Sequence, residues 1–148
     1  MQLSESILPY DEKTFILVAD RLRAKFYLAD KTNFTLIQEL INDRMEVGDS
    51  ERYASNVGGG ARLAISQDEQ LKEREAQTFY KQLAGILFER KQHSEYQKLI
   101  LVISHEDKNV LTDELHTTVR ESLELTIPKE LIKTPDDQLV KIIDGARR

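Results

Sequence analysis

The sequence predicts an α/β protein with a ribonuclease-H-like mixed sheet of five strands. Two continuous apolar runs, Thr14–Ala19 and Lys98–Ser104, are rich in strand-forming residues and are typical of strands buried on both faces. Two further strand-like segments follow the first run after very short links. A long segment of helical periodicity separates them from the second run, which indicates a crossover onto a parallel neighbour.

The first three strands are expected to form an antiparallel meander. Thr14–Ala19 is the buried central strand, and Arg23–Asp30 alternates Phe26 and Leu28 with polar neighbours, as a half-exposed strand does. The short link DKTN leads into a third strand, Phe34–Leu40. Links this short allow only antiparallel pairing between successive strands.

A long helix is predicted after a glycine-containing loop over residues 43–65. Ser66 and Glu69 have the spacing of a capping box, which predicts that the helix begins there and continues to about Lys91. Its apolar residues recur at near-helical spacing. They are Leu71, Ala76, Phe79, Tyr80, Leu83, Ile86 and Leu87.

After the second buried run, the spacing of Leu111 and Leu115 predicts one short helix, with Glu106 and Asp107 expected to cap its start. Ser122–Ile127 alternates leucine or isoleucine with polar residues, which is typical of a strand with one solvated face.

The last predicted helix has Thr134 as its cap, Pro135 in its first helical position and Gly145 at its end. The element order is therefore β-β-β-α-β-α-β-α. With the two buried strands side by side, right-handed crossovers give the strand order 3-2-1-4-5 with helices on both faces. We expect residues 1–148 to form a single domain.

Composition narrows the possible functions. The chain has 148 residues, a net charge of −5 and no cysteine, which excludes disulfides, zinc–thiolate sites and cysteine nucleophiles. An acidic domain is a poor general binder of nucleic-acid backbone, so any RNA contact is expected to be local. The first residues, MQLSESILPYDEK, lack the pattern of a signal peptide, and no apolar run is long enough for a membrane span. We expect a cytoplasmic protein without a membrane partner.

Catalytic chemistry has only weak support in the sequence. A two-metal nuclease on this fold would gather carboxylates from the first strand, the long helix and the fourth strand, but the fourth strand contains no acid. The candidates on the first two elements are Asp20, Glu69, Glu73 and Glu75. Ser104 and His105 are strand neighbours that point to opposite faces, so they cannot pair directly. We therefore predict no catalytic residue, no metal and no cofactor.

The glycine run in the loop is the candidate site. It is open to two interpretations: a flexible hairpin tip, or a backbone that approaches a phosphate or narrow crevice closely while nearby arginines bind phosphates. The residues of this partner-binding or RNA-binding loop are Arg52, Gly58, Gly59, Gly60 and Arg62.

Four segments, ILVADRLRAKFYLAD, REAQTFYKQLAGIL, KLILVIS and LTIPKELIKTPDDQL, resemble the bacterial host attachment family, the proteins required for attachment to host cells. The resemblance runs from about Phe15 to Ile143. That family is similar to the middle domain of archaeo-eukaryotic class-one peptide release factors, whose Gly-Gly-Gln tip before a long helix enters the ribosomal peptidyl-transferase centre. Gly58 and Gly59 match the two glycines, and Gly60 stands where the glutamine would be.

The resemblance implies a release-factor-like scaffold without the glutamine that is associated with positioning the attacking water. It favours a non-catalytic factor that contacts the ribosome, tRNA or other RNA through the glycine-rich loop. The first alternative is a protein-interaction module with an indirect role in attachment to host cells. The second is an enzyme, either a peptidyl-tRNA hydrolase or a nuclease. The oligomeric state stays open.

Overall fold

The computed structural model describes residues 1–44 and 61–148, with side chains for all of these except residues 61–68. One sheet has the strand order β3-β2-β1-β4-β5, which confirms the predicted order 3-2-1-4-5. The strands are β1 (Tyr10–Ala19), β2 (Arg23–Lys31), β3 (Asn33–Ile41), β4 (Lys98–Val102) and β5 (Leu123–Ile127). The labelled helices are α2 (Ala61–Gln92), α3 (Lys108–Glu114), α4 (Thr117–Ser122) and α5 (Asp136–Arg147).

The two buried runs are adjacent, as predicted. β1 pairs in parallel with β4, from Phe15 opposite Leu99 to Val18 opposite Val102. On their outer sides β1 pairs antiparallel with β2 and β4 pairs parallel with β5. The carboxyl ends of β1, β4 and β5 therefore lie side by side at the same end of the strands.

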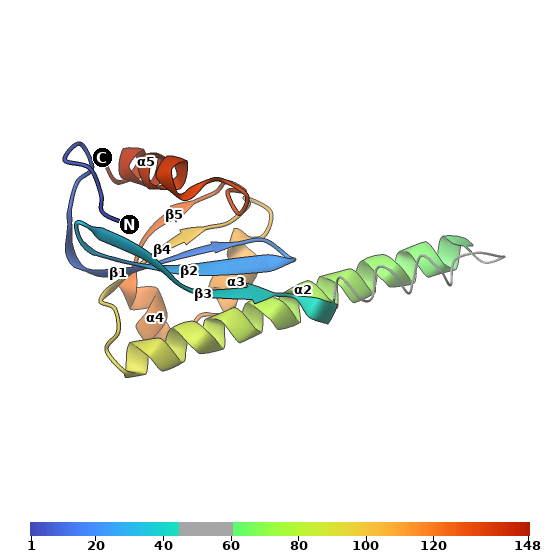
Figure 1. Ribbon diagram of the computed structural model, residues 1–148. Coiled ribbons are helices and arrows are strands. Elements are labelled where there is room, and N and C mark those ends of the chain that lie inside the picture. Colours follow the sequence, from blue (N-terminus) through green and yellow to red (C-terminus); the bar gives the residue numbers. More distant parts are fainter. Residues whose placement is uncertain (45–60) are drawn as a thin grey trace.

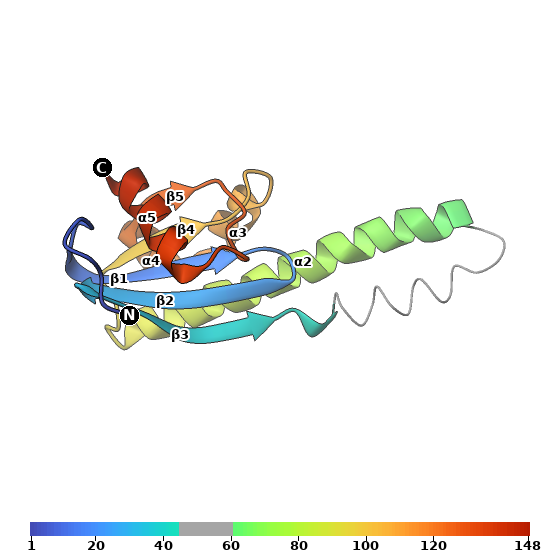
Figure 2. The same ribbon diagram turned by 45° about the horizontal axis from the view of Figure 1, so that its top comes forward.

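Alternating side chains of the central strands form two separate cores. Phe15 and Leu17 of β1 and Leu101 of β4 are fully buried against α2, α3 and α4. Ile16 and Ile100 point the other way, into a second core with α5 and the N-terminal segment. Figures 1 and 2 show α2 on one side of the sheet and α5 on the other, as the prediction of helices on both faces requires.

The predicted start of the long helix is wrong. α2 begins at Ala61, so Ser66 and Glu69 lie inside the helix rather than at its start, and the end of the predicted loop 43–65 is helical. Alanine, arginine and leucine in the added turn are good helix formers, which lets the helix continue past a local capping pattern. At the start of that predicted loop, Asp43 and Arg44 are also helical, and residues 45–60 lie outside the described residues.

Two short helices follow β4 where the leucine spacing predicts one. α3 ends at Glu114 with Leu115 as its C-cap, and α4 begins immediately afterwards with His116 as its N-cap. The imidazole of His116 accepts a hydrogen bond of 3.2 Å from the backbone N–H of Thr118. Sequence reasoning missed α4 because histidine is not among the residues commonly expected at an N-cap.

The predicted bounds of the last helix need two corrections. Pro135 is the cap of α5 rather than its first helical residue, and the helix passes through Gly145 to Arg147. Contacts distant in sequence hold the last turn in place, because the guanidinium of Arg147 donates to the carbonyl oxygens of Leu8 at 2.8 Å and Pro9 at 3.0 Å.

The central position of β4 can be tested with Leu101→Ala, which removes a fully buried side chain. We expect a loss of about 3 kcal/mol in the free energy of unfolding, because the lost apolar contacts leave a cavity. Urea denaturation measures it. Leu36→Ala on the exposed face of β3 is the control and is expected to cost about 0.5 kcal/mol or less. Equal losses for the two variants would contradict the assignment of β4 to the core.

Candidate functional site

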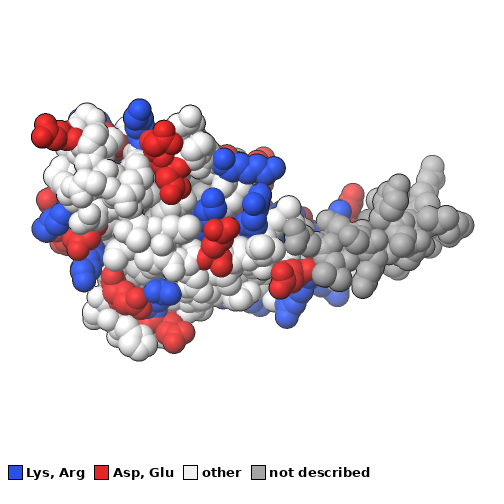
Figure 3. Space-filling model, viewed as in Figure 1, with Lys and Arg blue, Asp and Glu red and all other residues white. Residues whose placement is uncertain are grey.

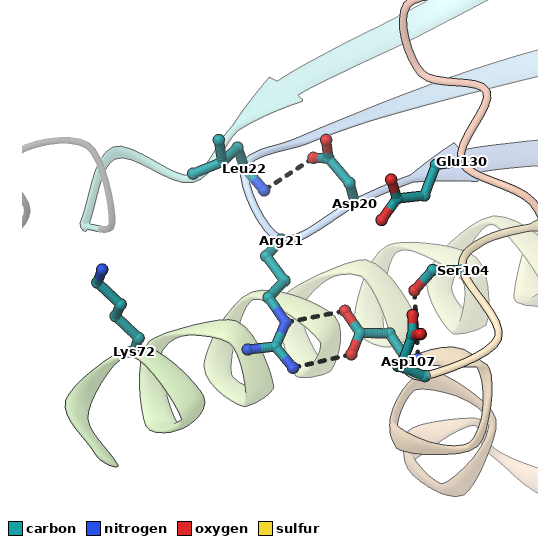
Figure 4. A pocket seen from close by; sticks show the side chains of 8 residues that line it. Asp20, Arg21, Leu22, Lys72, Ser104, Asp107 and Glu130 are labelled. Carbon is teal, nitrogen blue, oxygen red and sulfur yellow. Dashed lines mark hydrogen bonds and ion pairs between the residues drawn. The ribbon is translucent and has the colours of Figure 1, made fainter. Parts of the chain in front are cut away.

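A pocket of about 440 Å³ opens at the carboxyl ends of β1 and β4 (Figure 4). We call it the edge pocket. Its lining residues are Asp20, Arg21, Leu22, Lys72, Ser104, Glu106, Asp107 and Glu130. In α/β sheets ligands bind preferentially outside the carboxyl ends of the parallel strands, which makes this pocket a candidate binding site.

Arg21 joins three parts of the chain at the wall of this pocket. It follows β1, and its Nε and Nη2 donate to the two carboxylate oxygens of Asp107 at 3.0 and 2.9 Å. Its Nη1 donates to Oε1 of Glu73 on α2 at 2.8 Å. Tyr80, also on α2, donates to Oδ2 of Asp107 at 2.6 Å. We call these four residues the Arg21 junction.

The junction stabilises charged Asp107. Burial of this carboxyl acts to raise its pKa, but hydrogen bonds from Arg21 and Tyr80, together with the charge of Arg21, outweigh burial and hold the pKa below its usual value. Burial, and then the hydrogen bond to Asp107, raise the pKa of Tyr80, so the phenol stays protonated and donates. The structure thus corrects the expectation that Asp107 caps α3: it occupies the cap position, but its carboxylate makes no capping hydrogen bond.

The junction is suited to holding elements together rather than to binding an anion. Both edges of the Arg21 guanidinium are already occupied by carboxylates. The edge pocket also has more acidic than basic side chains, and Figure 4 shows Asp20 and Glu130 on the same side of it. A phosphate would meet these negative charges, so the chemistry of the lining does not favour one.

Two of the four acids considered for a metal site, Asp20 and Glu73, make contacts within the fold. Oδ1 of Asp20 accepts from the backbone N–H groups of Leu22 at 2.8 Å and Arg23 at 2.7 Å, which closes the turn between β1 and β2. Glu73 pairs with Arg21. Among the residues that the structure describes, no three histidines or acids are placed to share a metal ion.

Among the side chains that the structure describes, the serine hydroxyl and imidazole groups considered above are also not arranged as a nucleophile and its base. The Ser104 hydroxyl accepts a hydrogen bond of 3.3 Å from the backbone N–H of Asp107, whereas His105 is exposed. His93 directly follows α2, with its Nδ1 2.9 Å from the carbonyl oxygen of Glu89. His116 caps α4.

Most of the predicted loop site lies outside the described residues. This applies to Arg52, Gly58, Gly59 and Gly60, and to the side chain of Arg62, whose backbone belongs to α2. Sequence reasoning assigned no role to Arg21, although it falls within the ADRLRA stretch on which the family resemblance rests.

α2 extends well beyond the sheet (Figures 1 and 2). Its first buried side chain among those described is Ala76, and the ion pair of Glu73 with Arg21 ties it to the body nearby. Residues 61–71, which we call the projecting part of α2, span roughly 17 Å at the helical rise. On the face in Figure 3, acidic and basic side chains are interspersed over the body. Within the described residues no helix is long and apolar enough to cross a membrane.

Comparisons with known proteins agree with this architecture. The sequence profile of a family described as bacterial archaeo-eukaryotic release factor family 12 matches residues 13–143. The fold is similar to that of an archaeal translation termination factor, aRF1, with a TM-score of 0.51 at 15% identity. The similarity covers 78% of this chain and 29% of the archaeal one, so this chain spans well under half of that factor. No curated protein matches the chain. The release-factor part of the resemblance is confirmed, and its host-attachment part stays a prediction.

Asp107→Asn tests the electrostatics of the junction. Because the folded pKa of Asp107 lies below the unfolded one, its charged form stabilises the fold above about pH 4, and this contribution is lost as pH falls through the folded pKa. The variant should lose about 2–3 kcal/mol near pH 7, where charge-assisted hydrogen bonds are replaced by neutral ones. It should also lose less stability than the native chain between about pH 5 and pH 2.

Urea denaturation across this pH range measures both effects. The matched control is Asp113→Asn, which changes an exposed aspartate on the same helix as the capping position of Asp107. Parallel pH profiles for the native chain and Asp107→Asn would show that Asp107 is not stabilised as an anion in the fold.

Proposed function

The chain belongs to bacterial archaeo-eukaryotic release factor family 12, and on this premise we propose that it is a non-catalytic cytoplasmic factor that contacts the ribosome or RNA. The contact is made by the projecting part of α2 and by the glycine-containing segment that precedes it. The family and the fold support the scaffold, and the archaeal relative is itself a translation termination factor.

The single observation behind this proposal is the projecting part of α2. Its exposed residues Glu69, Gln70 and Leu71 lie outside the packed body, and the Arg21 junction fixes the direction in which the helix leaves it. A narrow helical projection can enter a cavity that the sheet is too wide to enter. Glycines before it leave backbone N–H groups unshielded, and arginines bind phosphates in a bidentate manner.

The absence of catalysis is proposed on chemical grounds. Gly60 has no side chain to position a water molecule, and the edge pocket brings no nucleophile and base together in the described part of the chain. The net charge of the whole protein is −5, which would repel nucleic acid, so the proposed binding role rests on local contacts.

Co-sedimentation with ribosomes tests the contact. We expect the native chain to travel with ribosomes at low salt and the double variant Arg52→Ala, Arg62→Ala to remain at the top of the gradient. Removing two phosphate contacts should also make the slope of log affinity against log salt shallower by about 1.5–2.

A matched double variant, Lys13→Ala with Lys133→Ala, removes the same charge from exposed positions outside α2 and should sediment like the native chain. A native chain that stays entirely at the top of a low-salt gradient, where electrostatic binding is strongest, refutes the proposed contact.

The non-catalytic part has its own test. Purified chain, incubated with peptidyl-tRNA and separately with RNA, should leave both substrates intact with and without added magnesium. Cleavage of either substrate, lost in a heat-denatured control, would replace the binding role with a hydrolase or nuclease activity.

A further inference from the structure

The two edges of the sheet are not equivalent. At the β3 edge the N-terminal segment covers the start of the strand, since Gln2 bridges Asn33 and Phe34 N–H donates to the carbonyl oxygen of Met1 at 2.9 Å. At the other edge, β5 pairs only with β4 among the described strands. The outer backbone groups of β5 are therefore open to another chain.

A groove of about 480 Å³ runs between this open edge and α5. Its lining includes the apolar residues Leu125, Pro128 and Ile142. α5 lies over the second core beside β5, so the helix forms one wall and the strand edge forms the other. An apolar groove next to unpaired strand backbone is the arrangement used in binding by strand addition.

The charged side chains that line the groove are two lysines, so its charge is positive. Lys129 follows β5 and Lys141 lies on α5; both line the groove and both are exposed. Neither forms an ion pair with another residue in the described ranges, whereas nearby Lys98 pairs with Glu124 at 3.5 Å. The groove therefore complements a ligand with carboxylates beside apolar side chains.

Gly145 keeps the helical wall open. It lines the groove, and a Cβ atom added to it would meet no atom within 4 Å. Glycine inside a helix costs stability relative to other residues. Its presence next to an unfilled groove is consistent with a close approach by another chain at this point.

We propose that the groove between β5 and α5 binds an extended acidic peptide segment of a protein partner, which adds to the sheet as a strand beside β5. Backbone hydrogen bonds to β5 hold the segment. Its side chains on the face toward α5 include apolar groups, which fill the groove, and carboxylates, which face Lys129 and Lys141. This inference is independent of the proposed ribosome contact, which was assigned to α2 and the segment before it. The apolar lining, without an aromatic ring for stacking bases, favours peptide over RNA.

Selection of random peptides of about ten residues against the full chain tests the proposal. We expect enriched peptides to be rich in β-branched residues and to carry aspartate or glutamate two residues away from an apolar residue, so that both side chains point into the groove. In ¹⁵N NMR titrations they should shift backbone amides of residues 123–129 and 141–146, with affinity that falls as salt increases.

Gly145→Leu separates binding from folding. The added Cβ meets no atom of the chain and leucine is a better helix former than glycine, so the Tm should not fall, while the larger side chain at the groove should lower affinity for the selected peptides at least about tenfold. Gly85→Leu makes the same change at an exposed helical glycine outside the groove and should bind as the native chain does. Lys141→Glu should weaken binding, and Lys81→Glu on α2 should not.

Three results overturn the proposal. Selection that yields no acidic peptides is one, and undiminished affinity in Gly145→Leu is another. The third is a single-stranded RNA oligonucleotide that shifts the amides of residues 123–129 when selected peptides do not, which would assign the groove to nucleic acid.

Discussion

The parallel pairing of β1 with β4 is the constraint on which the rest of the structure depends. Because neighbouring side chains alternate across the sheet, Phe15 and Leu17 build one core while Ile16 and Val18 build the other. Each core requires helices to cover it, which places α2 against one face and α5 against the other. The same pairing places the carboxyl ends of β1 and β4 side by side. The turn after β1 therefore brings Arg21 to Asp107, and both residues contact α2.

The fold could be predicted from the sequence wherever local pattern and burial agree. The runs around Phe15 and Leu101 are apolar on both faces, which leaves only the sheet centre for them. Helix ends were harder to predict, because they depend on contacts distant in sequence. α5 continues through Gly145 since Arg147 is held by carbonyl groups at the other end of the chain, and no local pattern contains that information.

The junction was harder still to predict. Asp107 stands where an acidic residue is expected to cap a helix, and only its burial beside Tyr80 and Arg21 redirects its carboxylate. These three residues come from three separate segments, so their meeting follows from the topology and not from any spacing in the sequence. The predicted loop residues differ from the junction in this respect, because glycines and arginines close together are easy to recognise in the sequence. Arg52 and Gly58–Gly60 lie outside the described part of the chain.

The division of α2 between a packed part and its projecting part has a consequence for its dynamics. Backbone amides between Phe79 and Leu87 belong to turns that carry fully buried side chains. Their hydrogen exchange with solvent therefore requires much of the domain to open. Amides between Glu69 and Glu75 belong to turns with no fully buried side chain, and fraying of the helix is enough to expose them. One continuous helix thus carries a gradient of local stability, with the Arg21–Glu73 contact at the point where it changes.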